Sequence, residues 1–523
     1  MQLKEKQQNH DITEPDPDVP DTQVASKEDI IPITSGELHR RLNYRQVQIM
    51  ALGGSIGTAL FVNIGGPLAK GGPLSLLISF ILYSAILACV NNCIAEMSVL
   101  HPTPGGFIRM AGKFVDDAFG FMAGWNYFIF EALTVPFEIT ALMMTLSFWR
   151  DDTPAGIVCG VCIALYSILD IFAVRVYGEI ELWGSSGKVL LISILFTVTF
   201  VVMVDGNPQY DAFGFRYWNN PGPMAEYLSS GSLGRFEGFL GSLWMASFTI
   251  VGPDYVTMIA AETQHPRTYV KKAFQMLYWR FGIFFVLAAV SVGILLPYND
   301  PTLIATFITD ASSGTKAAGS PFIIAMGNMQ ISILPDLMNA LLVTTIFSVG
   351  NSYLFCARSA YILRTSCDML SPLSLLQLGN GSSQALTWLT NILTTGGLII
   401  YFVMAVTNLF FHRACQAQGV DRTTFPCYGR FQPYSTWVVV IDEGLIILCY
   451  GYASFYPWDI STFFTHYTLV ILAPILFFFW NCVKRTEIIR PQEADLIWER
   501  PIVDSYEATM LPKPRGFWAE TLQ

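Results

Sequence analysis

Charged residues are scarce in this chain. Asp, Glu, Lys and Arg make up 13% of its 523 residues, about half of their share in a soluble protein. Apolar residues make up 52%, and the mean hydropathy is +0.45. This composition excludes an ordinary soluble domain and indicates a membrane protein. The net charge of −10 argues against a nucleic-acid partner, because such a partner requires a basic face.

Catalytic motifs are also lacking. The sequence contains no Walker loop, no Gly-x-Ser-x-Gly elbow and no His-Glu-x-x-His, and its 6 histidines form no local cluster. Cys159 and Cys162 have the spacing of half a metal site, but no second pair accompanies them. We interpret both as small residues of a lipid-buried helix. We therefore expect no enzyme, no metal and no cofactor, and any transport must be driven by gradients.

We expect no signal peptide, because the first segment is not apolar. Residues 1–45 are polar and rich in Pro and Asp, so they are expected to form a disordered tail on the cytosolic side. Eleven apolar segments then approach or exceed the length of about 20 residues that a membrane helix needs. These segments are long, and apolar and polar residues do not alternate along them, which favours membrane helices over a β-barrel. The predicted spans are Gln46–Ala69, Pro73–Cys93, Ala118–Phe148, Ala155–Phe172, Gly184–Val204, Phe236–Ala260, Trp279–Leu296, Leu334–Phe355, Ala385–Phe410, Trp437–Tyr452 and Thr462–Val483.

Basic residues mark cytosolic loops. They precede the first span and follow the second, fourth, sixth and eighth spans, which places the N-terminus in the cytosol; Arg280 is assigned to the loop after the sixth span. The pattern then breaks, because one span alone separates Arg364 from Arg413. The apolar stretch Met369–Leu378 between them contains Pro372 and is too short to cross. Either one helix is missing from this chain, or this region is re-entrant.

Two of the predicted spans contain helix-weakening residues at equivalent places. The first holds Gly53-Gly54-Ser55-Ile56-Gly57-Thr58, and each glycine weakens a helix by about 1 kcal/mol relative to alanine. The sixth holds Gly252-Pro253-Asp254, and proline removes a backbone donor. The first stretch alone is equally typical of close helix packing through small residues. The pair favours interrupted helices that bind a substrate in the middle of the bilayer.

Ionisable residues inside spans are costly and usually functional. Glu138 lies in the third span, Lys188 in the fifth and Asp254 in the sixth. For Glu138 and Lys188 the alternative is an internal ion pair that holds two helices together.

Several ordered motifs identify a family resemblance. The sequence resembles the fungal amino-acid permeases of the amino acid–polyamine–organocation superfamily from about Arg40 to Arg485. The resemblance implies an all-α, LeuT-type fold with two inverted five-helix repeats, residues 46–205 and 236–410, followed by two helices in 437–483 and a cytosolic tail, 484–523. The second repeat lacks the usual ninth span, so either a deletion or an error in the gene model is expected to have removed about one helix near Asp368–Leu378. The motifs are Leu52–Phe61, Glu96-Met97, Pro102–Phe107, Gly124–Tyr127, Val174–Lys188, Ala260–Arg267, Leu296–Pro301, Ala417–Asp421 and Gln432–Tyr434.

The resemblance also implies a site and an activity. Freed amides near Gly57 would meet a substrate carboxylate, and carbonyls near Ile56 and in Ile250–Gly252 would meet its amino group, with Phe248 as an aromatic gate. The implied activity is import of amino acids or related zwitterionic or cationic solutes by proton symport, across a fungal plasma membrane. The implied coupling residues are Lys188 and Glu138. The implied substrate-binding residues are Ser55, Ile56, Gly57, Thr58, Ala59, Phe248, Thr249, Ile250, Gly252 and Asp254.

Two departures from the family pattern keep alternatives open. Ala59 replaces the usual third glycine of the first-span motif, and Gly252-Pro253-Asp254 replaces the usual Gly-Thr-Glu. The alternatives are a nutrient sensor with a transporter fold and a carnitine or polyamine permease. Besides the substrate, protons and the lipid bilayer, the expected partners include ubiquitin-ligase machinery acting on tail lysines such as Lys4, Lys6 and Lys27.

Overall fold

The computed structural model describes residues 40, 42–53, 56–150, 154–172, 177–308, 320–359, 382–455 and 458–509. The expected deletion near Asp368–Leu378 and the tail lysines lie outside these residues. The part of the chain that is described is helical, apart from two isolated bridges that pair Leu42 with Thr263 and Phe455 with Trp458.

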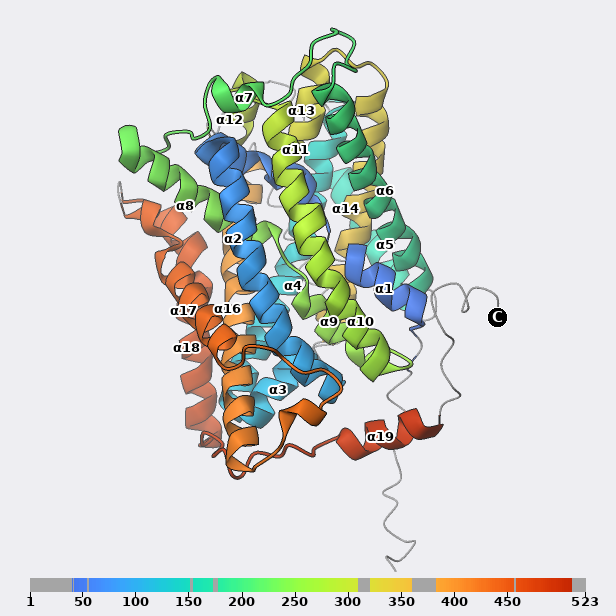
Figure 1. Cartoon of the computed structure of the whole chain (residues 1–523), viewed down its shortest axis with the longest axis vertical. Coiled ribbons are helices and arrows are strands. Elements are labelled where there is room, and N and C mark those ends of the chain that lie inside the picture. Colours follow the sequence, from blue (N-terminus) through green and yellow to red (C-terminus); the bar gives the residue numbers. More distant parts are fainter. Residues whose placement is uncertain are drawn as a thin grey trace, which may run out of the picture. The chain divides into compact units, whose positions relative to one another are not determined.

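Figure 1 shows the order of the helices along the chain. In chain order they are α1 (Tyr44–Gly53), η1 (Ala59–Asn63), α2 (Gly65–Leu100), α3 (Gly106–Phe114), α4 (Asp117–Leu146), α5 (Ala155–Phe172), α6 (Tyr177–Met203), α7 (Arg216–Asn219), α8 (Gly231–Thr249), α9 (Pro253–Ile259), η2 (Ala260–Glu262), α10 (Pro266–Trp279), η3 (Arg280–Val286), α11 (Leu287–Leu295), α12 (Pro301–Phe307), α13 (Pro321–Asn328), α14 (Leu334–Ser359), α16 (Ser382–Ala417), η5 (Arg422–Thr424), α17 (Tyr434–Cys449), η6 (Tyr452–Ser454), α18 (Ile460–Lys484) and α19 (Arg500–Thr509).

Eight of the described helices are long and apolar enough to cross a membrane. The chain is therefore a multi-pass helical membrane protein, as its composition predicts. α5 adds a shorter apolar stretch, and the first and sixth predicted spans are each interrupted. The total of eleven crossings stays a prediction.

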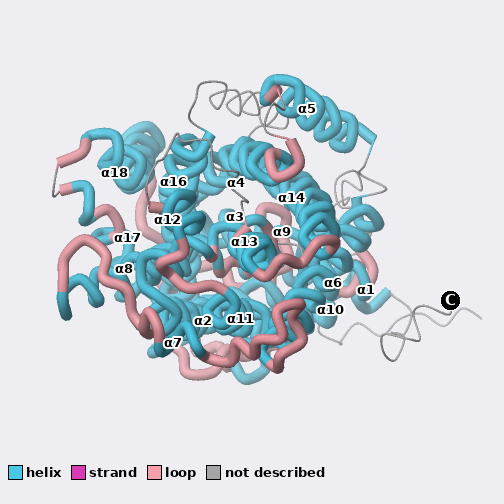
Figure 2. The backbone as a smooth tube through the Cα atoms, turned by 90° about the horizontal axis from the view of Figure 1, so that it is seen from above, coloured by secondary structure: helices cyan, strands magenta, loops and turns pink. Residues whose placement is uncertain are grey.

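The helices differ widely in how much protein covers them. In the most apolar windows of α4 and α16, 72% and 78% of the residues are buried, against 11% in α18. Figure 2 shows α18 and α5 at the rim and α4 and α9 near the middle. On α18, Ile475, Phe478 and Phe479 are each more than half exposed. A helix that shows so many large apolar side chains is stable where lipid covers it.

A kink divides α2 after its first two turns. Gly72 has φ 77°, a left-handed value that favours glycine, and Pro73 follows it. The kink receives the loop before α8: Leu74 N–H donates to Pro223 O at 2.8 Å, and Ala225 N–H donates to Gly71 O at 2.9 Å. A Cβ at Gly72 would lie 2.8 Å from Ala225 N. The glycine is therefore required by both the turn and the close approach.

The segment after α18 is packed against the loops at one end of the bundle. Arg109 of α3 pairs with Glu499 at 2.6 Å, and its guanidinium lies 5.0 Å from the ring of Trp498. Arg267, at the start of α10, pairs with Asp504 of α19. Arg40 lies over the ring of Tyr506 at 4.5 Å. Helix α19 thus contacts both Arg40, which precedes α1, and the start of α10.

A short backbone bridge joins the beginning of α1 to the end of η2. Leu42 N–H donates to Glu262 O at 3.0 Å, and Gln264 N–H donates to Leu42 O at 3.1 Å. The half-helices α1 and α9 are therefore tied together on the side away from their interruptions.

Candidate functional site

The first interruption lies between α1 and η1, where the glycines predict it. α1 ends at Gly53, Ile56 and Gly57 lie outside any helix, and η1 begins at Ala59. Ile56 N–H donates to Gly53 O and Leu60 N–H to Gly57 O, each at 3.1 Å. Since a helix end leaves several backbone groups without an intrahelical partner, this stretch can offer them to a ligand.

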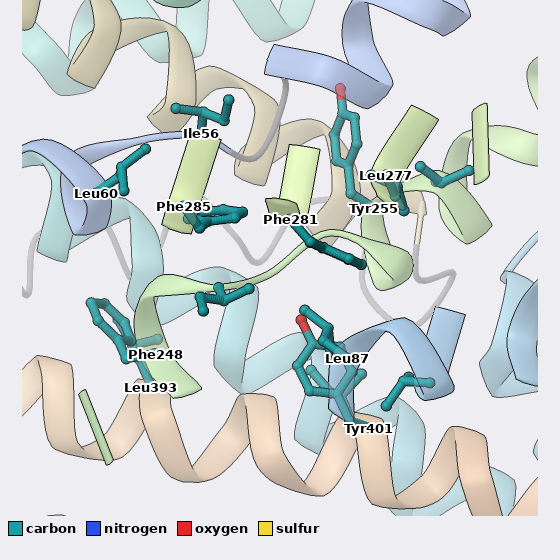
Figure 3. Packing of buried hydrophobic residues seen from close by; sticks show 14 of the residues in the cluster. Ile56, Leu60, Leu87, Phe248, Tyr255, Leu277, Phe281, Phe285, Leu393 and Tyr401 are labelled. Atoms are coloured by element: carbon teal, nitrogen blue, oxygen red, sulfur yellow. The ribbon is translucent and has the colours of Figure 1, made fainter. Parts of the chain in front are cut away.

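The second interruption separates α8 from α9. Ile250 ends α8 with extended dihedral angles, and Gly252 has φ 149° and ψ −33°. Pro253 occupies the first turn of α9, where its fixed φ and missing N–H are tolerated. The replacement of the family's threonine by Pro253 is therefore compatible with the break. Figure 3 shows the extended chain between Phe248 and Tyr255.

Asp254 stabilises the backbone of this second interruption. One of its carboxylate oxygens accepts hydrogen bonds from Gly252 N–H and from the Tyr401 hydroxyl of α16, both at 3.1 Å. The side chain is buried. Asp254 therefore fixes the unwound backbone rather than lining the cavity described next.

A small cavity lies where the two interruptions meet helices α4 and α14. Its volume is about 20 Å³, room for about one water molecule. The rings of Phe137 and Phe248 meet edge to face at 5.4 Å, and those of Phe130 and Tyr353 at 6.4 Å. An amino acid would therefore fit only after these rings move. The lining residues are Gly57, Ala59, Phe130, Thr134, Phe137, Glu138, Phe248, Val251 and Tyr353.

Glu138 connects the cavity wall to the first interruption. Its carboxylate accepts a hydrogen bond from the Thr58 hydroxyl, and both side chains are buried. A change in the protonation of Glu138 would therefore alter its hydrogen bond with Thr58, the residue that follows Gly57.

Lys188 lies in a second buried polar cluster, between α6 and α14. Its ammonium is 3.3 Å from Glu181, and neither side chain is exposed. Glu181 also accepts hydrogen bonds from Ser185 at 2.9 Å and from Ser352 at 2.7 Å. The ion pair that the structure records for Lys188 is thus with Glu181, on its own helix.

The predicted substrate-binding residues therefore divide into groups. Gly57, Ala59 and Phe248 line the cavity together with the predicted coupling residue Glu138. The other described residues do not line the cavity. The Thr58 hydroxyl donates to Glu138, Asp254 accepts from Gly252 N–H, and the Thr249 hydroxyl donates to Met245 O within α8. The side chains of Ile56 and Ile250 are fully buried. Ser55 lies outside the described residues.

Sequence reasoning missed several residues of the site. Nothing local distinguishes Phe130, Phe137 and Tyr353 among the 38 Phe and 22 Tyr of the chain. Glu181 did carry a signal, because it lies seven residues before Lys188 and hence on the same helix face.

Arg280 is counted with the loop after the sixth span although it is also the second residue of the predicted span Trp279–Leu296, and the loop assignment is wrong. α10, η3 and α11 run without a break from Pro266 to Leu295. Arg280 lies inside this helix and is 1% exposed.

The fold and the site together define a helical membrane protein with two interrupted helices beside one cavity. Comparisons with known proteins are consistent with this class. The family described as amino acid permease matches residues 46–363 and 359–490. The general amino acid permease AGP2 of Saccharomyces cerevisiae is 36% identical over 505 residues, covering 90% of this chain and 84% of that protein. A proline-specific permease of the same yeast is 32% identical over 483 residues, covering 86% and 76%.

The chain belongs to the fungal amino acid permease family. Its fold is similar to that of a manganese transporter from Eremococcus coleocola, with a TM-score of 0.50, 13% identity, and coverage of 90% of this chain and 99% of that one.

Proposed function

We propose that the protein is a secondary active transporter that imports amino acids or related zwitterionic or cationic solutes by proton symport. The observation that carries the proposal is the meeting of two interrupted helices at one cavity that Glu138 lines. Interrupted membrane helices present freed N–H groups to an anion and freed carbonyls to a cation. A zwitterion requires both kinds of group in one place.

In this proposal the substrate carboxylate binds near Gly57, Thr58 and Ala59. The N-terminal end of the half-helix that continues at η1 favours negative charge. The amino group binds carbonyls near Ile56 and in Ile250–Gly252, where the chain is extended. Phe248 closes the cavity through its contact with Phe137.

Proton coupling would use Glu138, with Lys188 as a second ionisable group. Glu138 contacts both the cavity and, through Thr58, the first interruption. A proton that binds Glu138 removes its charge, and this alters the hydrogen bond with Thr58 at the place where substrate binds.

The proposal includes an arrangement in the membrane. The chain forms two inverted five-helix repeats, 46–205 and 236–410, the second one span short, with two further helices in 437–483. Its N-terminus and the tail from 484 lie in the cytosol, and the membrane is the plasma membrane. The basic residues of the loops and the resemblance to the family support this arrangement.

Uptake measurements test the function. The purified protein in liposomes is expected to accumulate a radiolabelled amino acid when the outside is acidic, and to lose this accumulation when a protonophore collapses the gradient. Glu138→Gln is expected to reduce gradient-driven uptake at least about tenfold. Glu443→Gln is the matched control, since Glu443 is an equally buried glutamate that accepts from Tyr83 at 3.2 Å and does not line the cavity.

Three results would contradict parts of the proposal. Uptake that persists unchanged without a proton gradient would remove the symport. Binding of amino acids without any flux would favour a nutrient sensor. Competition by carnitine or polyamines, but by no amino acid, would favour the alternative permease, to which the departure at Gly252-Pro253-Asp254 points.

A further inference from the structure

Arg280 is a charged residue in the interior of the bundle. It opens the π-helical stretch η3, and its side chain is almost completely buried. Single π-helical turns inside longer helices recur at functional sites. A buried guanidinium is costly unless its donors and its charge are compensated.

One contact of Arg280 is with the end of α1. Its Nη1 donates to Ala51 O at 3.0 Å. Ala51 lies in the last turn of α1, where carbonyls lack intrahelical partners and the helix dipole favours a cation.

The other contact is with the second interruption. A Cβ placed on Gly252 would lie 2.1 Å from Nη2 and 2.8 Å from Cζ of Arg280. The guanidinium therefore occupies the space that a side chain at residue 252 would need. It also interacts electrostatically with Asp254, whose carboxylate accepts from Gly252 N–H.

Two aromatic rings lie beside this group. The guanidinium lies 5.5 Å from the ring of Phe285 and 5.9 Å from that of Phe281; both rings lie beside the extended chain of the second interruption (Figure 3). Arg280 thus faces both interruptions from outside the cavity.

We propose that Arg280 is a positioning residue of the transport site, a tethered cation that joins the two interruptions and holds their freed backbone groups in the binding arrangement. The inference rests on the proposed function. In transporters with interrupted helices, half-helix carbonyl ends and unwound backbone coordinate dissolved cations. Here a side-chain cation takes such a place, so this junction requires no dissolved ion.

Two variants separate charge from geometry. Arg280→Lys keeps the charge, but an ammonium reaches either Ala51 O or Gly252 and not both, because it lacks the planar fork of a guanidinium. We expect its KM for amino acid uptake to rise about tenfold and its maximal rate, at equal amounts in the membrane, to change less. Arg280→Met removes the charge and is expected to lose uptake. The matched control is Arg235→Met, whose exposed side chain pairs with Glu226 at 3.6 Å outside the site and which should behave as wild type.

A double variant covers the case in which Arg280→Met does not reach the membrane. Arg280→Met leaves Asp254 without its nearby cation, so combining it with Asp254→Asn removes both charges and should restore delivery. The KM of the double variant is expected to stay raised. A KM within twofold of wild type in Arg280→Lys, or in whichever uncharged variant is delivered, would overturn the inference. If wild type itself neither transports nor gains thermal stability on adding amino acids, the proposed function fails instead.

Discussion

At Gly57 there is almost no room for a side chain beside the backbone of the cavity. A Cβ on Gly57 would lie 2.9 Å from Cγ1 and 3.1 Å from Cγ2 of Val349, on α14. A methyl group there must displace Val349 by a few tenths of an ångström or move the backbone that the substrate is proposed to contact.

We predict that Gly57→Ala lowers amino acid uptake about tenfold or more while the protein still reaches the membrane, because overpacking shifts the freed amides. The double variant Gly57→Ala/Val349→Ala restores the space and should recover part of the uptake. Initial uptake rates, divided by the surface amount of each variant, provide the measurement. Gly160→Ala on α5 is the control, since no atom lies within 4 Å of a Cβ placed there. Equal loss in the single and double variants would show that the contact with Val349 is not the cause.

The glycines and the buried acid of the site could be predicted from the sequence, but Arg280 could not. It is the second residue of the predicted span Trp279–Leu296, and the charge count nevertheless groups it with Lys271 and Lys272 in one loop. The structure starts the helix at Pro266 instead, which carries Arg280 well inside the protein. Whether a cation near a span end snorkels to water or points inward depends on its helix neighbours, and a single sequence does not show these.

At the scale of elements, an ion pair fixes the loop between α16 and α17 to the end of α2. Arg422 donates to both carboxylate oxygens of Glu96, at 2.8 and 2.7 Å, and Gly429 N–H adds a third bond at 3.1 Å. The side chain of Glu96 is 0% exposed and that of Arg422 is 11% exposed. Bidentate pairs of this kind are among the stronger charge-assisted hydrogen bonds.

Removing one partner of this ion pair should lower the stability of the protein more than removing both charges. Arg422→Met leaves a buried carboxylate without its cation and is expected to destabilise the protein by about 3 kcal/mol. The double variant Arg422→Met/Glu96→Gln leaves no buried charge and should be more stable than the single one. Thermal unfolding of the purified proteins in one detergent measures both. A double variant less stable than the single one would contradict the explanation.

The interrupted elements were predictable because glycine and proline act locally on the backbone, at Gly53–Thr58 and at Gly252-Pro253 alike. The ends of other helices were not. α10 begins at Pro266, whereas the hydrophobic run begins at Trp279, since a membrane helix can continue into water with charged residues on its surface. The aromatic walls also depend on how α4, α8 and α14 pack together, which no local pattern encodes.

At the scale of the whole molecule, the C-terminal segment buries a histidine. His101, directly after α2, lies 5.6 Å from the ring of Trp498 and 5.8 Å from that of Phe114. Neither ring nitrogen has a hydrogen-bond partner among the described residues. Burial, with smaller contributions from Arg500 and Arg267 and an opposing one from Asp495, lowers the pKa of His101 to about 4.

This burial predicts a pH dependence of stability. The folded pKa lies below the ordinary value of about 6.5, so the stabilising contribution is complete above pH 6.5 and is lost as the pH falls towards 4, on the order of 2 kcal/mol by pH 5. Thermal unfolding at pH 7.5 and at pH 5 should show this loss in wild type and a smaller loss in His101→Gln. Trp498→Ala, which lets water reach the ring, should behave like His101→Gln. An equal pH effect in all three would exclude His101 as the source.

The two backbone hydrogen bonds of Leu42, to Glu262 and from Gln264, have a mechanical consequence. These bonds couple the motions of α1 and α9. Neither half-helix can tilt away unless the other moves with it or both hydrogen bonds break. If the protein opens by tilting one of these half-helices, the other should tilt with it. The opening between the helices would then widen in a single cooperative step rather than by two independent tilts.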